Sequence, residues 1–184
     1  MRRFIENETR FEGLFSVTKN TRSDERGYFE RLFDPSELKC WANRPVIQVN
    51  RTFTKSKGTI RGLHFQKPPF LEAKFICCTK GSIMDVALDL RKKSKTFKQT
   101  FTTKLDEKKH DAIFIPEGFA HGFQTLSDNV EVLYFHSNEY APTHEAGINA
   151  FDPSLKISWQ LLCRSISERD AELMKLDDFE GLCP

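Results

Sequence analysis

Apolar and polar residues alternate in short runs along most of this chain, a pattern typical of strands that bury one face. The runs recur at intervals of about 8–12 residues, are separated by glycine, proline or polar turns, and leave little room for helices. This spacing predicts an all-β fold, an antiparallel sandwich or barrel, formed as one domain by residues 1–184. The expected strands are one or two within 1–20, then 28–33, 46–50, 58–66, 73–79, 82–90, 97–104, two within 111–126, and 129–135.

Two segments carry signals for a short helix. Asp34 can cap one over residues 34–38, with Pro35 at the first helical position. Ser167 can cap the other near the C-terminus, with Asp170 in the capping-box position. After residue 142 the alternation loosens, and we expect a peripheral loop with a short strand at 157–159.

The stretch 58–66 combines a strand pattern with reactive residue types. Arg61 and His64 stand among its glycines and apolar residues, where a purely structural strand needs neither of them. A site that holds an anion and moves a proton does need both. Asp85 also lies inside an apolar run, so it needs a buried partner, and we expect it to orient His121.

Composition and charge narrow the function classes. Phenylalanine occurs 17 times, and the net charge of +2 gives no general reason to expect a nucleic-acid partner. No apolar run approaches the roughly 20 residues that cross a membrane, and we expect neither a signal peptide nor a membrane partner. The five cysteines include no CxxC pair, so we expect reduced thiols in a cytoplasmic protein, with Cys77 and Cys78 on opposite faces of a strand.

Three residues on expected strands could move protons: His64, His121 and Tyr134. A histidine could take a proton next to a carbonyl group, while Lys74 stabilises the enolate and the tyrosine returns a proton. A base and an acid on opposite faces would invert a carbon centre, which favours an epimerase; a ligand-binding barrel is the alternative. A metal site is disfavoured, because Gln66 stands where metal-binding barrels of this kind place the second histidine of a His-x-His pair.

Longer motifs make the function more specific. Residues 59–66, 80–91 and 115–123, with shorter matches at 24–27 and 140–142, resemble the signatures of the dTDP-4-dehydrorhamnose 3,5-epimerase family. The resemblance runs from about residue 12 to residue 172. It implies a cupin-type jelly-roll barrel (a double-stranded β-helix) with short peripheral helices, no metal or other cofactor, and a homodimer. The implied substrate is a dTDP-4-keto-6-deoxy sugar.

The resemblance also implies a role for each matching residue. His64 would be the base, paired with Asp170, and Tyr134 would be the acid. Lys74 and His121 would be active-site polar residues. The implied substrate contacts are to the pyrophosphate from Arg26 and Arg61, to the sugar nucleotide from Gln48 and Asn50, and to the nucleotide by packing of Phe29 and Tyr140.

Several alternatives stay open at this point. Relatives commonly carry Glu five residues after the arginine that Arg26 matches, whereas this chain has Arg31 there and Glu30 one place earlier. This difference leaves recognition of the nucleotide base open. Asp170 can serve both the helix cap and the base only if the helix opens toward the barrel mouth. A 3-epimerase or 5-epimerase alone, a 3,4-ketoisomerase and a catalytically silent sugar-nucleotide binder are the competing functions. The complete set of base, carboxylate and acid favours an enzyme.

Overall fold

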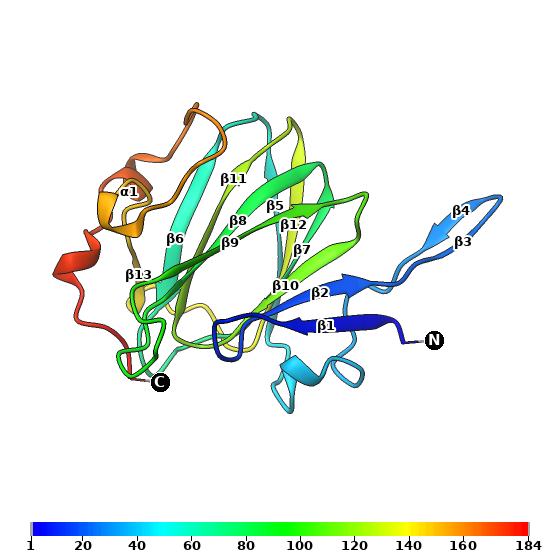
Figure 1. Ribbon diagram of the computed structural model, residues 1–184, viewed down its shortest axis with the longest axis horizontal. Helices are drawn as coiled ribbons and strands as arrows, with labels where there is room; N and C mark the ends of the chain where they lie inside the picture. The colour runs from blue at the N-terminus through cyan, green and yellow to red at the C-terminus, as the bar shows by residue number, and fades with distance from the viewer. Residues whose placement is uncertain (1, 184) are drawn as a thin grey trace.

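The computed structural model describes residues 2–183, which fold into two antiparallel β-sheets packed face to face, as expected for a cupin-type jelly roll (Figure 1). The six-stranded sheet has the order β1-β2-β10-β7-β12-β5, and the five-stranded sheet has the order β13-β6-β11-β8-β9. The strands are β1 (Phe4–Glu8), β2 (Phe15–Lys19), β3 (Arg22–Asp24), β4 (Gly27–Phe29), β5 (Gln48–Thr54), β6 (Ile60–Gln66), β7 (Lys74–Lys80), β8 (Ser82–Asp89), β9 (Thr100–Asp106), β10 (Asp111–Ile115), β11 (Phe119–Thr125), β12 (Val130–His136) and β13 (Glu145–Gly147). The helical segments are η1 (Lys39–Trp41), η2 (Pro153–Leu155), α1 (Glu168–Ala171) and η3 (Leu176–Asp178).

Buried side chains form three apolar layers around the two sheets. The inner layer lies between the sheets and includes Cys78 and Tyr134. A second layer covers the outer face of the five-stranded sheet, where the C-terminal segment runs along β6 (Figure 1). A third covers the outer face of the six-stranded sheet and includes Trp41 and Cys77. The neighbouring cysteines therefore do face opposite sides of β7, and all five cysteines are free thiols.

Strands β6 and β11 approach each other unusually closely at two glycines. A Cβ atom on Gly62 would lie 2.6 Å from the carbonyl oxygen of His121, and one on Gly122 would lie 2.5 Å from that of Arg61. The pairing register shifts at this point, and His64 stands directly opposite His121. Because both residues are glycine, β6 and β11 can come this close, and His64 and His121 lie next to each other on the paired strands.

Some sequence-based element predictions were wrong. The run 28–33 forms a strand only over Gly27–Phe29, which pairs with β3 in a hairpin that stands away from the body (Figure 1). Residues 34–38 form a turn, because the carboxylate of Asp34 binds both Ser36 and Arg31 and the chain continues only into the 3-10 segment η1. No strand forms at 157–159; the extra strand is β13, which adds to the edge of β6.

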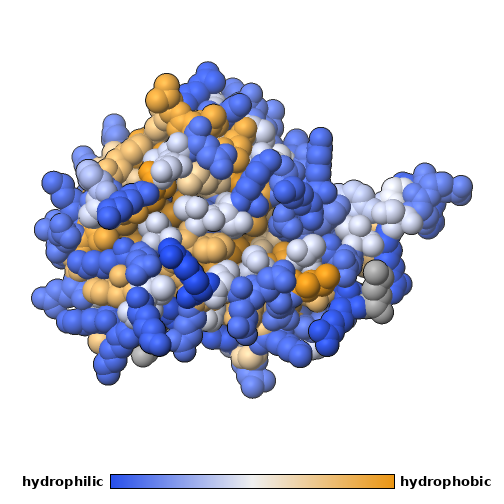
Figure 2. Space-filling view, viewed as in Figure 1, coloured by the Kyte–Doolittle hydropathy of each residue, from blue (hydrophilic) through white to orange (hydrophobic). Residues whose placement is uncertain are grey.

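Most of the surface on the face drawn in Figure 2 is polar. Figure 2 shows a largely hydrophilic surface with scattered apolar areas, and the tip of the projecting hairpin is hydrophilic. Among the residues that the structure describes, no helix is both long and apolar enough to cross a membrane.

Candidate active site

A cavity of about 550 Å³ opens at one end of the space between the two sheets. Its walls continue the inward-facing positions of both sheets, so polar side chains here replace the apolar ones of the inner layer. The lining residues are Gln48, Asn50, Thr52, Arg61, His64, Phe65, Gln66, Glu72, Lys74, His121, Gly122, Phe123, Tyr134, His136, Tyr140, Glu145, Ser167, Arg169 and Asp170.

His64 and Asp170 form a hydrogen-bonded pair in this cavity. The Nε2 atom of His64 lies 2.8 Å from Oδ1 of Asp170, and the backbone N–H of Gly62 donates to Oδ2 at 2.9 Å. Burial acts to raise the pKa of Asp170, but the hydrogen bonds from His64 and Gly62 outweigh it and lower the pKa to about 2. Asp170 is therefore an ionised acceptor at neutral pH, and the other ring nitrogen of His64 is left to act on a ligand.

Helix α1 brings Asp170 to the cavity. The hydroxyl of Ser167 accepts a hydrogen bond from the backbone N–H of Asp170, so the predicted N-cap is present. The capping box is incomplete, because the carboxylate turns to His64 and Gly62 instead of back to Ser167. The opening of the helix faces the cavity, so the backbone of Asp170 takes part in the cap while its carboxylate pairs with His64.

His121 forms a second, deeper pair with a carboxylate. Its Nε2 atom lies 2.7 Å from Oδ2 of Asp85, and both side chains are buried. This contact confirms that Asp85 orients His121, and it explains a carboxylate inside an apolar strand. The second oxygen of Asp85 has no hydrogen-bond partner among the described residues.

Tyr134 faces the histidines from the other sheet. Its ring centroid lies 6.1 Å from that of His121, and its hydroxyl lies 3.4 Å from that of Thr52. Burial raises the pKa of Tyr134 above its ordinary value, against a smaller opposite effect of Thr52. The phenol therefore keeps its proton at neutral pH and is available as a donor.

Lys74 lies on the same sheet as Tyr134 and is only 8% exposed. Its Nζ atom lies 3.1 Å from Oε1 of Glu72, whose other carboxylate oxygen is 2.7 Å from Nδ1 of His136. Burial acts to raise the pKa of Glu72, but the charge of Lys74 and the contact with His136 lower it to about 2. The cavity thus holds a buried cation, fixed by a carboxylate that the sequence analysis did not single out.

The rim of the cavity carries polar and aromatic groups. Gln48 and Asn50 line it from β5, and Arg61 lines it from β6 while donating to the hydroxyl of Thr54 at 3.0 Å. The hydroxyl of Tyr140 donates to Glu145 at 2.7 Å. Arg169, another residue that the sequence analysis missed, pairs with Glu145 at 3.0 Å and places its Nη2 atom 3.2 Å from Nε2 of His64.

The chain is similar to known sugar-nucleotide epimerases over nearly its whole length. The family model described as dTDP-4-dehydrorhamnose 3,5-epimerase matches residues 8–178. The chain belongs to this family. It is therefore an enzyme of the isomerase class, and the resemblance seen in its motifs is confirmed.

Individual relatives of the epimerase family agree with this assignment. The dTDP-4-dehydrorhamnose 3,5-epimerase of Mycobacterium tuberculosis (strain H37Rv) is 37% identical over 94% of this chain and 88% of the relative. A dTDP-4-dehydrorhamnose 3-epimerase of Streptomyces niveus is 32% identical over 94% of this chain and 85% of the relative. The 3,5-epimerase of Bacillus anthracis, solved with TDP and pyrophosphate bound, superposes with a TM-score of 0.91 at 34% identity, covering 94% of this chain and 99% of that one.

Two predicted site residues of this epimerase-family chain do not line the cavity. Arg26 and Phe29 lie on the projecting hairpin, where Arg26 pairs with Asp24 and Phe29 is 60% exposed. The hairpin extends outward from the body, so within one copy of the chain these residues stand apart from the cavity lining (Figure 1). The prediction that they bind substrate therefore requires a second copy.

The unusual pair at positions 30 and 31 also lies outside the cavity lining. Glu30 binds Lys19 at 2.8 Å and His110 at 3.2 Å, whereas Arg31 binds Asp34 at 2.7 Å. Both side chains are thus engaged in ion pairs away from the cavity, Arg31 with a near neighbour in sequence and Glu30 with Lys19 and His110.

Gln66 has a structural role where a metal-binding barrel would carry a histidine. Its amide donates to the backbone oxygens of Phe70 and Glu139, and it accepts from the backbone N–H of Ala141. The side chain ties the loops around β6 together, and its polar atoms are used in doing so.

Proposed function

We propose that this chain inverts carbons 3 and 5 of dTDP-4-dehydro-6-deoxy-D-glucose and gives dTDP-4-dehydro-L-rhamnose. One observation carries the proposal: a histidine on one sheet, paired with a carboxylate from helix α1, and a protonated tyrosine on the facing sheet line the same cavity. A base and an acid on opposite walls are what the inversion of a carbon centre requires. Family membership supplies the class of substrate.

In the first step His64 takes a proton from the carbon next to the 4-keto group. Asp170, ionised and hydrogen-bonded to the ring, stabilises the imidazolium that forms and fixes which nitrogen acts as the base. The electron pair of the broken C–H bond moves toward the keto oxygen and gives an enolate.

Lys74 stabilises the enolate oxygen in this proposal. Its ammonium group is buried in the cavity wall, where a positive charge interacts more strongly with a developing oxyanion than it would in water. His121, held by Asp85, lies on the facing sheet beside the same space.

In the second step Tyr134 gives its phenolic proton to the other face of the enolate carbon. The carbonyl group re-forms and the configuration is inverted. Proton exchange with water then restores the neutral histidine and the phenol, so no cofactor is consumed. Repeating the sequence at the second carbon gives the double epimerisation.

The rim of the cavity is the place where the nucleotide part of the substrate would bind. We assign Gln48, Asn50 and Arg61 to polar contacts with the sugar and the pyrophosphate, and Tyr140 to packing against the nucleotide. Arg61 is exposed and carries a charge suited to a phosphate group.

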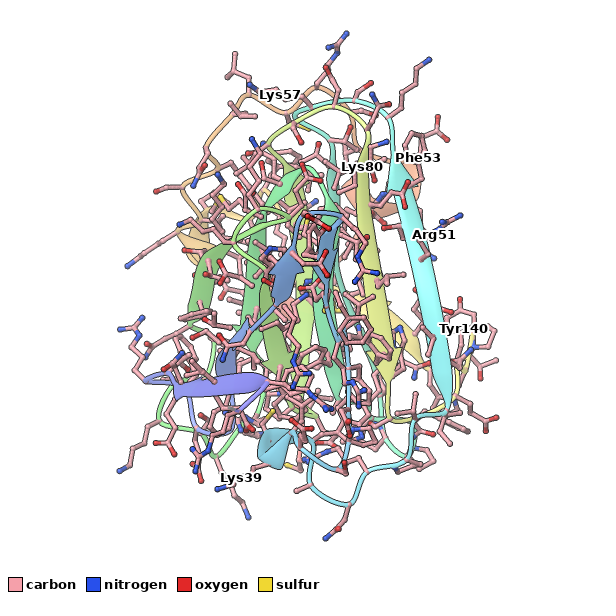
Figure 3. The ribbon with its side chains drawn as sticks, turned by 90° about the vertical axis from the view of Figure 1, so that its right-hand side faces the viewer. Lys39, Arg51, Phe53, Lys57, Lys80 and Tyr140 are labelled. Carbon is pink, nitrogen blue, oxygen red and sulfur yellow. The ribbon has the colours of Figure 1, made fainter. Side chains whose placement is uncertain are left out.

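A symmetric homodimer would complete this site. Strand β5 is an open edge, and its residues Gln48, Asn50 and Thr52 line the cavity. The alternate residues Val49 and Phe53 are 55% and 52% exposed, and Figure 3 shows Phe53 on this strand. The hairpin carries Tyr28 and Phe29, which are 62% and 60% exposed. If β5 edges of two copies meet, each hairpin can cross to its partner and bring Arg26 and Phe29 toward the other rim.

The proposal is tested by incubating the protein with dTDP-4-dehydro-6-deoxy-D-glucose in D₂O and observing carbons 3 and 5 by NMR. We expect deuterium at both carbons and formation of the L-rhamno product, and we expect His64→Ala to abolish both. Deuterium at carbon 3 alone would assign the single epimerisation that the Streptomyces niveus relative is named for. Migration of the keto group would assign a ketoisomerase, and binding without any exchange would assign the silent binder.

A further inference from the structure

Three largely buried side chains form a connected network in the cavity wall around Lys74. The side chains of Glu72 and Lys74 are each 10% exposed, and that of His136 is 12% exposed. The two oxygens of Glu72 are divided between its neighbours, with Oε1 at 3.1 Å from Nζ of Lys74 and Oε2 at 2.7 Å from Nδ1 of His136. Each oxygen therefore accepts from a different donor.

His136 is itself held in place by its surroundings. Its ring stacks on that of Tyr134, with centroids 6.0 Å apart and planes 25° apart. Its Nε2 atom lies 3.4 Å from the amide nitrogen of Asn50. Strand pairing places His136 opposite Lys74. Its imidazole therefore contacts Tyr134, the Glu72 carboxylate that binds Lys74, and Asn50 on β5.

A lysine needs such support to act on an enolate. Its ammonium ends a flexible four-carbon chain, and stabilisation of a transition state depends on donors that are already in place. A buried ammonium group without a partner also tends to turn toward water or to lose its proton. A carboxylate fixed on its other side removes both problems, and it leaves two ammonium protons free for the ligand.

We propose that Glu72 is a positioning residue, anchored by His136, that holds the Lys74 ammonium where the enolate oxygen forms. The assignment rests on the proposed function, because it refines the role of Lys74 in that reaction. It also gives His136 a function, although this residue lies at the end of β12 and outside the motifs that identify the family.

Glu72→Gln is the decisive variant, because glutamine keeps the size of the side chain but has a single acceptor oxygen. The neutral amide removes the negative charge that fixes the Lys74 ammonium, and only its oxygen can accept, so the contact with His136 must be lost or reverse its direction. We expect kcat for deuterium exchange and product formation to fall about tenfold or more, with KM and TDP affinity close to wild type. The thermal midpoint should fall, because a buried ion pair is broken, so kcat is compared at a temperature where both proteins are fully folded.

Coupling to Lys74 separates positioning from a general structural effect. On a Lys74→Met background, Glu72→Gln should cause no further loss of exchange, because its target is already absent. Glu117→Gln is the matched control: it removes a half-buried carboxylate paired with Arg44 at 2.8 Å, outside the cavity lining, and it should leave kcat and KM unchanged.

The outcomes separate the two proposals. Turnover of Glu72→Gln at the wild-type rate, a loss expressed as a raised KM, or the same loss on the Lys74→Met background would each overturn the positioning role while the proposed function stands. Wild-type protein that exchanges no substrate protons would overturn the proposed function and this role together.

Discussion

At the scale of single residues, inversion depends on the proton that Tyr134 supplies. The buried phenol keeps its proton because burial raises its pKa. Tyr134→Phe removes that proton but leaves His64 and Asp170 intact, so the substrate should still exchange with solvent when His64 returns the proton it took. We expect exchange within about tenfold of wild type and product formation reduced at least about a hundredfold, measured together by NMR in D₂O.

The same experiment can contradict the assignment in two ways. Wild-type inversion in Tyr134→Phe would mean that water or another residue is the acid. Loss of exchange as well as inversion would mean that Tyr134 takes part in forming the enolate.

Metal dependence is also decided by a single position. The side-chain amide of Gln66 forms hydrogen bonds with three backbone groups, and it stands where a His-x-His ligand pair would place the second histidine after His64. We expect turnover to survive prolonged dialysis against EDTA. Stoichiometric zinc or iron in the purified protein, with activity lost on its removal and restored on its return, would refute this prediction.

Nine of the eleven site residues predicted from the motifs line the cavity, but the motifs missed residues whose roles arise from the fold. Asp170 could be proposed because it stands in a recognisable motif, although it is far from His64 in sequence. Glu72 follows a proline loop and looks like an ordinary solvent-exposed charge. Only the pairing of β7 with β12 shows that it lies between Lys74 and His136.

At the scale of elements, the site depends on how closely β6 and β11 approach. Gly122→Ala would place a Cβ atom 2.5 Å from the carbonyl oxygen of Arg61 and 2.6 Å from a side-chain carbon of Leu63. The strands must separate to admit it, which should lower stability by about 1–3 kcal/mol and displace His121 from its place opposite His64.

Thermal unfolding and the exchange assay measure these two effects separately. We expect a lower unfolding temperature for Gly122→Ala and a loss of kcat in the protein that remains folded. A variant with wild-type stability and wild-type exchange would show that the close approach is not required.

The alternation of residues predicted most strands but not how the N-terminal elements are used. Central strands such as β7 and β8 stand out because long apolar runs can only be buried. The hairpin of β3 and β4 has no such constraint, since its residues are exposed in the single chain. Its polar turn was visible in the sequence, but its projection from the body was not.

At the scale of the whole molecule, the chain has features that a second copy would explain. The exposed Val49 and Phe53 on the edge of β5 and the aromatic residues of the hairpin are apolar groups left in water. An open edge with such residues favours pairing with another chain. The two site residues that do not line the cavity, Arg26 and Phe29, belong to that same hairpin.

We therefore expect light scattering at micromolar concentration to give twice the chain mass of 21.4 kDa. Phe53→Lys should shift the protein toward the monomer, because it places a charge on the proposed interface. Ile5→Lys is the matched control, since Ile5 is 45% exposed on β1, at the other edge of the same sheet, and should leave the dimer intact. Because Arg26 and Phe29 would then lack a partner cavity, the Phe53→Lys monomer should bind TDP more weakly while its His64–Asp170 pair stays intact. A wild-type mass of about 21 kDa, or a monomer that binds TDP as tightly as the wild type, would contradict the shared site.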